Sequence, residues 1–312
     1  MIKNKKPGSK RKLGGAFHKN NMTLLLFCLP AILLTFVFGY LPMGGIWMAF
    51  TEFRFDLGLF SRPFVGLDNF WIFQTPVMFR IIRNTIGYGL GLMLIGHVTA
   101  IILALLLYEI RSKKALKFYQ TAYTIPNYMS WIIISYLTYI FLSPTNGLIN
   151  SFLELIGSDR VNLFTRPMAW IIIIPIVSIW NGVGLQSILY YAALMGVDPE
   201  LYDAAKVDGA NRLKQIRYIS LPSIMPTFTI LVILGMRNIL RGDFGLFYAV
   251  TRNVGLLYPT TDILDTYIFR GLRAGNFGAT TAVGLVQSVV GMFVILIVNA
   301  VVKKLSPGSE LF

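Results

Sequence analysis

Residues 84–108 read NTIGYGLGLMLIGHVTAIILALLLY and contain no Asp, Glu, Lys or Arg. As an α-helix this stretch would be roughly 37 Å long at about 1.5 Å per residue, which exceeds the hydrocarbon thickness of a bilayer. Peptide N–H and C=O groups must be hydrogen-bonded inside lipid, and a helix pairs them within one segment. The stretch is therefore expected to be a membrane-spanning helix.

Five further stretches of more than 18 residues lack charged side chains in the same way. Only 13% of the 312 residues are charged, whereas a soluble domain carries about 25%. These features predict one all-α membrane domain with six transmembrane helices. The charge-free stretches lie at 20–51, 84–108, 118–153, 167–197, 218–236 and 274–302.

Some predicted spans carry features that affect packing. The spacing of Gly87 and Gly91 is typical of helices that approach a neighbour closely. Pro126 cannot donate a backbone hydrogen bond, so a kink is expected in the third span, with neighbouring groups satisfying the freed carbonyl. The fifth span is expected to start after Pro222 and to end near Arg241.

The net charge of +14 has a positional pattern that argues against nucleic-acid binding. All 13 lysines lie at 3–19, 113–117, 206–214 and 303–304, and the other three inter-span loops contain none. Cytoplasmic loops of membrane proteins carry such an excess of basic residues. We therefore expect both termini in the cytoplasm, with a basic tail that contacts lipid head groups over 1–21, a transmembrane domain over 22–304 and a C-terminal tail over 305–312.

Several chemistries find no support in the sequence. Cys28 is the only cysteine, so no internal disulfide can form. His18 and His97 have no neighbouring metal ligands, so no metal site is expected. No Gly-Lys dipeptide occurs, which excludes a Walker phosphate-binding loop. No cofactor is expected in this chain.

The loop 195–222, between the predicted fourth and fifth spans, is the most informative part of the sequence. Asp198 suits a helix N-cap, and Pro199 suits the first helical position. Gly209 interrupts the helix, and a second helical stretch over 211–219 follows before the chain returns to the membrane. The residues alone predict two short helices joined at a glycine, which could dock on another protein or lie on the lipid surface.

The same loop carries a recognisable motif. The pattern Asp203-Ala204-Ala205, Gly209 and Ile219-Ser220-Leu221-Pro222 resembles the EAA motif of permease subunits in binding-protein-dependent ABC importers. Asp203 stands where Glu is usual, which keeps the charge and shortens the side chain by one methylene. Stretches similar to the carbohydrate branch of that family, including permeases for polysaccharides and oligosaccharides, lie at 64–70, 83–85, 265–267 and 278–284.

The resemblance implies the fold of a type I ABC importer permease, which forms half of the translocation pathway for a saccharide in a bacterial plasma membrane. It implies that residues 199–209 form a coupling helix on a cytoplasmic ATPase subunit. That subunit would bind ATP and Mg, so this chain would not be an enzyme. It further implies a second homologous permease and an extracytoplasmic sugar-binding protein as partners. The residues assigned to coupling are Asp203, Ala204, Ala205, Gly209, Ile219, Leu221 and Pro222.

Polar residues in and near the spans are candidates for the sugar path, because such residues usually face an interior or water-filled cavity. Arg237 and Arg241 are four residues apart and are expected to share one face of the fifth span. They could line the cavity, or instead reach the outer surface or pair with Asp243. The full set of candidates is Asn181, Gln186, Tyr190, Arg237, Asn238, Arg241 and Asp243.

Two other functions compete with ATP-driven import. An ion-coupled secondary transporter would usually carry carboxylates inside the membrane, whereas Glu109 lies only at the inner edge of the second span. An intramembrane enzyme would need a catalytic group of residues, and no His-Glu-x-x-His motif, paired aspartates or Ser/His arrangement supports one. The leading hypothesis remains a permease subunit.

Overall fold

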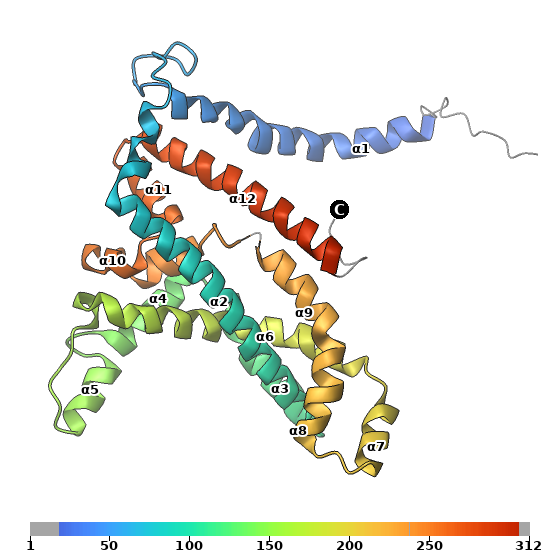
Figure 1. The fold of residues 1–312 in the computed structure, drawn as a ribbon. Coiled ribbons are helices and arrows are strands. Elements are labelled where there is room, and N and C mark those ends of the chain that lie inside the picture. Colours follow the sequence, from blue (N-terminus) through green and yellow to red (C-terminus); the bar gives the residue numbers. More distant parts are fainter. Residues whose placement is uncertain (1–18, 237, 306–312) are drawn as a thin grey trace, which may run out of the picture.

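The computed structural model describes residues 19–236 and 238–305, and this part of the chain is almost entirely helical (Figure 1). Five helical segments in it are long and apolar enough to cross a membrane. They are Leu24–Phe50, Pro76–Tyr108, Pro167–Met195, Arg212–Met236 and Phe277–Ala300. A sixth span is reached only if the bent pair Lys113–Tyr128 and Trp131–Leu142 counts as one. The predicted all-α membrane class is confirmed.

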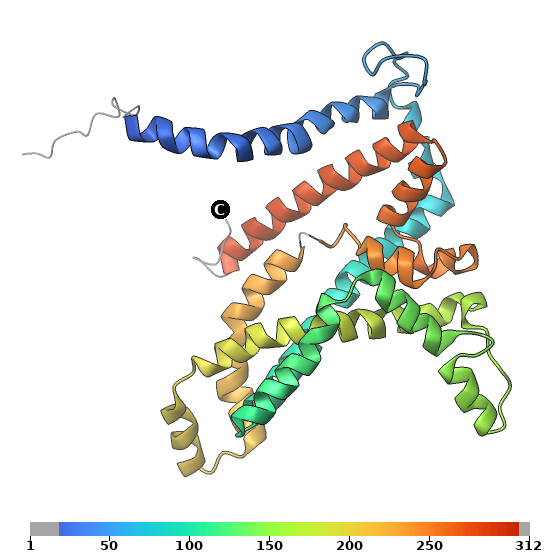
Figure 2. The same cartoon turned by 180° about the vertical axis from the view of Figure 1, so that it is seen from behind.

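The first span consists of α1 (Lys19–Thr35), the π-helical η1 (Phe36–Tyr40) and the 3₁₀-helical η2 (Leu41–Phe50). Figures 1 and 2 show α1 standing away from the other helices, while η2 packs against α12 (Phe277–Leu305). No residue in the most apolar stretch of this span is buried. The first span therefore meets the described chain near one end only.

An outer loop and η3 (Asp68–Gln74) follow the first span. The amide nitrogen of Asn69 donates to the carbonyl oxygens of Ala49 and Thr51 at 3.1 and 3.0 Å, which ties the loop to the end of that span. Figure 1 places this loop at the opposite end of the molecule from α7 (Pro199–Val207). The two ends are called outer and inner below.

The centre of the bundle is formed by α2 (Pro76–Tyr108), α6 (Trp170–Met195) and α9 (Leu221–Met236). These helices share a buried apolar core at their inner halves, in which small residues of α2 face larger ones of α6 and α9. Its buried members are Ala100, Ala104, Tyr190, Leu194 and Ile224. The core joins the inner ends of three spans into one packed unit.

The close helix approach predicted at Gly87 and Gly91 lies elsewhere. A Cβ atom at either position would meet nothing within 4 Å, whereas one at Gly89 would clash with the backbone of Ile239. Residues four apart share a helix face, and a residue midway between them points to the other side. The spacing of small residues was recognised correctly, but the wrong face of α2 was chosen.

The third span differs most from its prediction. It consists of α3 (Lys113–Thr124), the 3₁₀-helical η4 (Ile125–Tyr128) and α4 (Trp131–Leu142), and its two halves are bent by 102°. Pro126 lies in η4, and the hydroxyl of Ser130 accepts from the N–H of Ile133 at 3.4 Å as the N-cap of α4. The expected kink is a full break because a separately capped helix starts directly after the turn.

α6 holds this break in place. The amide nitrogen of Asn181 donates to the carbonyl oxygen of Pro126 at 2.7 Å. Gly184, one turn further along α6, packs against the backbone of Tyr123 so closely that any side chain would clash. A neighbouring span therefore donates to the carbonyl of the proline itself. The carbonyl that the proline frees belongs to the residue four positions earlier, so the predicted partner for it stays a prediction.

Shorter helices fill the outer side of the bundle between the spans. They are α5 (Leu148–Leu155), η5 (Leu163–Thr165), η6 (Pro167–Ala169), η8 (Gly245–Val250), η9 (Gly255–Leu257), α10 (Tyr258–Thr261) and α11 (Leu264–Arg273). Their positions depend on polar contacts as well as on apolar packing.

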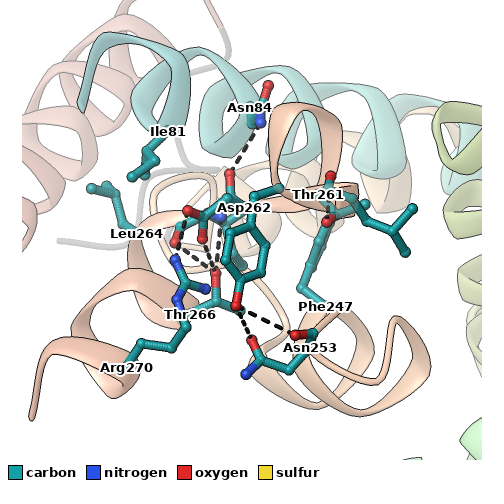
Figure 3. A network of polar contacts seen from close by, with 12 residues as sticks. Ile81, Asn84, Phe247, Asn253, Thr261, Asp262, Leu264, Thr266 and Arg270 are labelled. Atoms are coloured by element: carbon teal, nitrogen blue, oxygen red, sulfur yellow. Dashed lines mark hydrogen bonds and ion pairs between the residues drawn. The ribbon is translucent and has the colours of Figure 1, made fainter. Parts of the chain in front are cut away.

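A polar network around the buried residue Asp262 ties α11 to α2 (Figure 3). Arg270 pairs with Asp262 at 2.6 Å, and the hydroxyl of Thr266 donates to the same carboxylate at 2.8 Å. The amide nitrogen of Asn84 on α2 donates to the backbone carbonyl of Asp262 at 3.1 Å. Because a buried charge is tolerated only when it is paired and hydrogen-bonded, this network fixes one arrangement of the outer segments.

The ends of the predicted segments also change. The helical segment of the fifth span begins at Arg212, before Pro222, and ends at Met236, before Arg241. Beyond it the N–H of Asn238 donates to the carbonyl of Gly235 at 2.9 Å, so the backbone tightens into turns. Most of the two predicted tails, residues 1–18 and 306–312, lies outside the described residues, as does Arg237.

Candidate functional site

The loop 195–222 lies at the inner end of the bundle, where α7 projects beyond the spans (Figures 1 and 2). The side chain of Asp198 accepts from the N–H of Glu200 at 2.9 Å and caps the helix. Gly209 ends it in the left-handed region, at a φ of 73°, which glycine adopts without steric cost. The predicted first helix and its break at a glycine are confirmed.

The second half of the loop leads into the membrane without the expected interruption. α8 (Arg212–Gln215) is capped by the side chain of Asn211 and continues through the π-helical η7 (Ile216–Ser220) into α9. The prediction that the span starts after Pro222 is therefore wrong. Proline is tolerated within the first turn of a helix, and the wider π-helical turn directly precedes it.

One side of the loop is exposed and partly apolar. The side chains of Val207 and Leu213 are 89% and 75% exposed. Asp203, Ala204 and Gly209 are exposed as well. Large apolar side chains exposed on a projecting loop are available for contact with another protein.

The opposite side of the loop is fastened to the spans. The ring of Tyr202 lies 5.8 Å from the ring of Tyr108 at the end of α2, and its hydroxyl lies 3.0 Å from the hydroxyl of Ser220. Arg212 pairs with Glu109, also at the end of α2, at 2.9 Å. The inner ends of the second and fifth spans are thus linked through this loop.

The remaining predicted coupling residues lie in or near this fastening. Leu221 packs against the inner core, Ala205 and Ile219 are half-buried, and Pro222 is exposed. Tyr202 was not among the residues predicted from the sequence. The sequence did contain a signal for Tyr202. It directly precedes Asp203 on a short helix, and adjacent residues of a helix point to different sides. Tyr202 can therefore face the spans while Asp203 faces away from them.

A cavity of about 420 Å³ lies between α2, α6, α9 and the segment 238–247. Four of the predicted substrate-path residues line it: Gln186, Asn238, Arg241 and Asp243. The cavity therefore gathers polar groups from one span, α6, and from the turns that follow another, α9.

Further lining residues come from α2 and α6 and were not predicted. They include Thr85, Tyr88, His97 and Ser178. Thr85, Tyr88 and Leu92 recur at helical spacing along α2, which is the pattern by which this face could have been recognised in the sequence. The polar side chains on it were too widely spaced to stand out within an apolar run.

The charge of Arg241 lies at this cavity. None of the ion pairs in the described part of the chain contains Arg241, so the alternative of pairing with Asp243 is not found. The carboxylate of Asp243 instead accepts a hydrogen bond from the N–H of Leu246 at 3.2 Å. Arg241 lies beyond the end of α9, and the expectation that it shares a helix face with Arg237 stays a prediction because Arg237 lies outside the described residues.

Two predicted substrate-path residues hold the bundle together. Asn181 donates to Pro126 as described above. Tyr190 is buried, and its hydroxyl lies 2.9 Å from Nδ1 of His97. Both side chains are used in contacts between helices, whereas the polar groups of the cavity come from other positions.

Comparison with known proteins identifies the family. A family model described as binding-protein-dependent transport system inner membrane component matches residues 96–307. The match covers more than half of the chain and includes the loop 195–222. The chain belongs to this family. It is thus a multi-pass membrane component of such a transport system, a permease subunit and not the ATPase.

Similar proteins occur in Bacillus subtilis. The permease is 36% identical to the polygalacturonan/rhamnogalacturonan transport system permease protein YteP over 284 residues. The aligned part covers 90% of this chain and 88% of YteP. It is 34% identical over 293 residues to protein LplB, with coverage of 92% and 90%. The similarity extends over nearly the whole length of each chain.

Solved structures are similar in fold. The permease matches a chain of a bacterial ABC transporter involved in the import of the acidic polysaccharide alginate, with a TM-score of 0.83, 34% identity and coverage of 92% of this chain and 97% of that chain. A second structure shows a bacterial alginate transporter in complex with a periplasmic protein that carries an alginate pentasaccharide, with a TM-score of 0.82, 34% identity and coverage of 93% and 96%. The family resemblance read from the sequence is confirmed.

Proposed function

We propose that this permease forms half of the translocation pathway of an ATP-driven importer for an oligosaccharide or polysaccharide. The observation that carries the proposal is an exposed inner loop, attached to the spans, at one end of a bundle that contains a polar cavity. Such an arrangement can convert movement at the loop into movement of the spans. The polygalacturonan/rhamnogalacturonan permease and the alginate transporter to which the chain is similar support a saccharide as the substrate.

A cytoplasmic ATPase subunit is the partner that we propose for the inner loop. The exposed apolar side chains of Val207 and Leu213 would lose contact with water on docking, which favours association. Asp203, Ala204 and Gly209 lie on the exposed side and would form part of the contact. ATP and Mg would then be bound by the ATPase, and both termini of the permease would lie on the same, cytoplasmic side.

A second homologous permease is the partner that we propose within the membrane. The first span is apolar yet unburied along its most apolar stretch, so most of its surface is free for another subunit. A second permease would complete the pathway for the saccharide beside this cavity. An extracytoplasmic binding protein would deliver the saccharide at the outer loops.

We further propose that the saccharide is acidic. Arg241 brings a positive charge to the cavity, where it interacts electrostatically with Asp265 but is in none of the ion pairs within 4.0 Å in the described chain. A guanidinium group binds carboxylates through two parallel hydrogen bonds. The names of the similar proteins refer to polygalacturonan and alginate, which fits a uronate as the recognised unit.

The test is uptake by vesicles that contain the permease, a second permease and the ATPase, with the loaded binding protein added outside. We expect uptake of oligogalacturonate only when ATP is trapped inside, and weaker uptake of a neutral oligosaccharide of equal length. Uptake that an ionophore abolishes without any need for ATP would indicate a secondary transporter. Chemical conversion of the saccharide by the permease alone would indicate an enzyme.

A further inference from the structure

Tyr202 connects α7 to two spans at once. Its side chain is 7% exposed, although its sequence neighbours Leu201 and Asp203 are exposed. The ring packs against Tyr108 of α2, and the hydroxyl reaches Ser220, which is 2% exposed and directly precedes α9. One side chain of the projecting helix therefore contacts both the second and the fifth span.

The other links between the loop and the spans are softer. The Arg212–Glu109 pair is about half exposed on each side, at 55% and 42%, and exposed ion pairs contribute little because water competes for both charges. On its two sides α7 is joined to the neighbouring helices by short turns that contain Gly196 and Gly209. A buried hydrogen bond holds its geometry better, since breaking it leaves two hydroxyls unpaired away from water.

We propose that the Tyr202–Ser220 hydrogen bond is the latch that transmits displacement of α7 to the inner end of α9. The inference rests on the proposed function, in which an ATPase displaces α7. With the bond formed, α7, Tyr108 and the start of α9 move as one body. Without it, α7 moves relative to the start of α9, so less saccharide is moved for each ATP that is hydrolysed.

The experiment uses Tyr202→Phe, Ser220→Ala and the double variant in the complete reconstituted complex. Phenylalanine keeps the ring and its contact with Tyr108 and removes only the hydroxyl. We expect ATPase co-purification at the wild-type level, and saccharide uptake per ATP hydrolysed that is lower by about fivefold, the ratio that corresponds to one hydrogen bond of about 1 kcal/mol. All three variants lack the same bond and should show the same loss.

The double variant separates a latch from a contact that only stabilises the fold. Each single variant leaves one buried hydroxyl unpaired, whereas the double variant leaves none, so thermal stability should recover in the double variant. Uptake per ATP should stay low in it. Tyr218→Phe is the matched control, because Tyr218 belongs to the same loop but is 69% exposed, and its uptake per ATP should equal that of the wild type.

Three results would overturn the latch: unchanged uptake per ATP in Tyr202→Phe, recovery of coupling in the double variant, or a loss that is explained wholly by weaker ATPase binding. A wild-type complex that binds no ATPase, or shows no ATP-dependent uptake, would instead overturn the proposed function. The two failures are distinguishable because the second is visible before any substitution is made.

Discussion

The carboxylate of Asp203 illustrates how single residues of the inner loop are prepared for a partner. It accepts from the ammonium group of Lys206 at 2.7 Å, and the two side chains are 72% and 56% exposed. An exposed ion pair of this kind contributes roughly 0–1 kcal/mol. The carboxylate can therefore exchange Lys206 for a cation of a docked ATPase at little cost. The Asp203 side chain keeps the charge of the usual Glu, although it is one methylene shorter.

Gly209→Glu should uncouple the permease from its ATPase. A Cβ atom at Gly209 would meet nothing within 4 Å in this chain, so the space around it is open to a partner. A docked subunit would bury the added charge without a counter-charge, which costs several kcal/mol in effective terms. We expect normal insertion into the membrane and loss of ATPase co-purification, measured by pull-down from solubilised membranes.

Gly157→Glu is the matched control for that substitution. Gly157 also has a positive φ, 75°, and open space around it, but it lies in the outer loop after α5. The backbone strain of about 1–2 kcal/mol in the left-handed region is the same at both positions. If Gly157→Glu impairs ATPase binding as strongly as Gly209→Glu does, strain and not the docking surface explains the effect.

Arg241→Ala should reduce saccharide uptake more than it reduces assembly of the complex. The substitution removes the positive charge from the cavity, and a charge-assisted hydrogen bond contributes roughly 1.5–3 kcal/mol. We expect a rise in the apparent KM for an acidic oligosaccharide of about tenfold or more, with unchanged subunit stoichiometry. Arg54→Ala, at an exposed ion pair with Asp56 in the outer loop, should leave both values unchanged.

At the scale of the elements, the broken third span is the feature that shapes the bundle. The turn between α3 and α4 redirects the chain by 102°, so that α4 packs against η8 and α3 packs against α6. The hydroxyl of Ser135 on α4 donates to the carbonyl of Ala249 in η8 at 2.6 Å. A straight helix could not make both sets of contacts, and the break therefore brings the outer segment 245–250 to the edge of the cavity.

Asn181→Ala should destabilise the fold at this break. Pro126 is buried, and its carbonyl would lose the hydrogen bond from the Asn181 amide while it keeps the one from the N–H of Met129 at 3.1 Å. We expect a loss of about 0.5–1.5 kcal/mol in the free energy of unfolding, the usual net contribution of one hydrogen bond, read as a lower unfolding temperature in detergent. Asn146→Ala, at an exposed position of the outer loop, is the control and should unfold as the wild type does.

At the scale of the whole molecule, the distribution of contacts divides the chain into an attached part and a free part. The second, fourth and fifth spans share one inner core, while the first span stands apart (Figures 1 and 2). The inner loop and the outer loops lie at opposite ends of this unit. Such a polarity is needed for a protein that receives a substrate at one face and a driving force at the other.

Cysteine labelling tests this polarity. In a Cys28→Ser background, Asp56→Cys, Ser158→Cys and Leu256→Cys should react with an impermeant thiol reagent added to intact cells. Lys114→Cys and Lys214→Cys should react only after the membrane is opened. The wild-type side chains at all five positions are exposed, so a failure to react reports on sidedness. Labelling of Lys214→Cys from outside would contradict the proposed orientation.

The sequence by itself determined the membrane class, the approximate limits of most spans and the two helices of the inner loop. Hydropathy acts on each segment independently of its neighbours, because lipid solvates every span alike. The caps at Asp198 and Asn211 and the left-handed Gly209 are equally local, since each involves atoms only a few residues apart in the chain. Such features can be predicted from the sequence because they do not depend on distant segments of the chain.

Only the tertiary structure decided which side chains meet. It placed the close approach at Gly89 instead of Gly87 and Gly91, and it turned a predicted kink at Pro126 into a break. It brought Gln186, Asn238, Arg241 and Asp243 to one cavity and used Asn181 and Tyr190 to join helices. The physical reason is that all these outcomes depend on the rotation of each helix about its own axis. That rotation is set by contacts with distant segments and leaves no trace in the order of neighbouring residues.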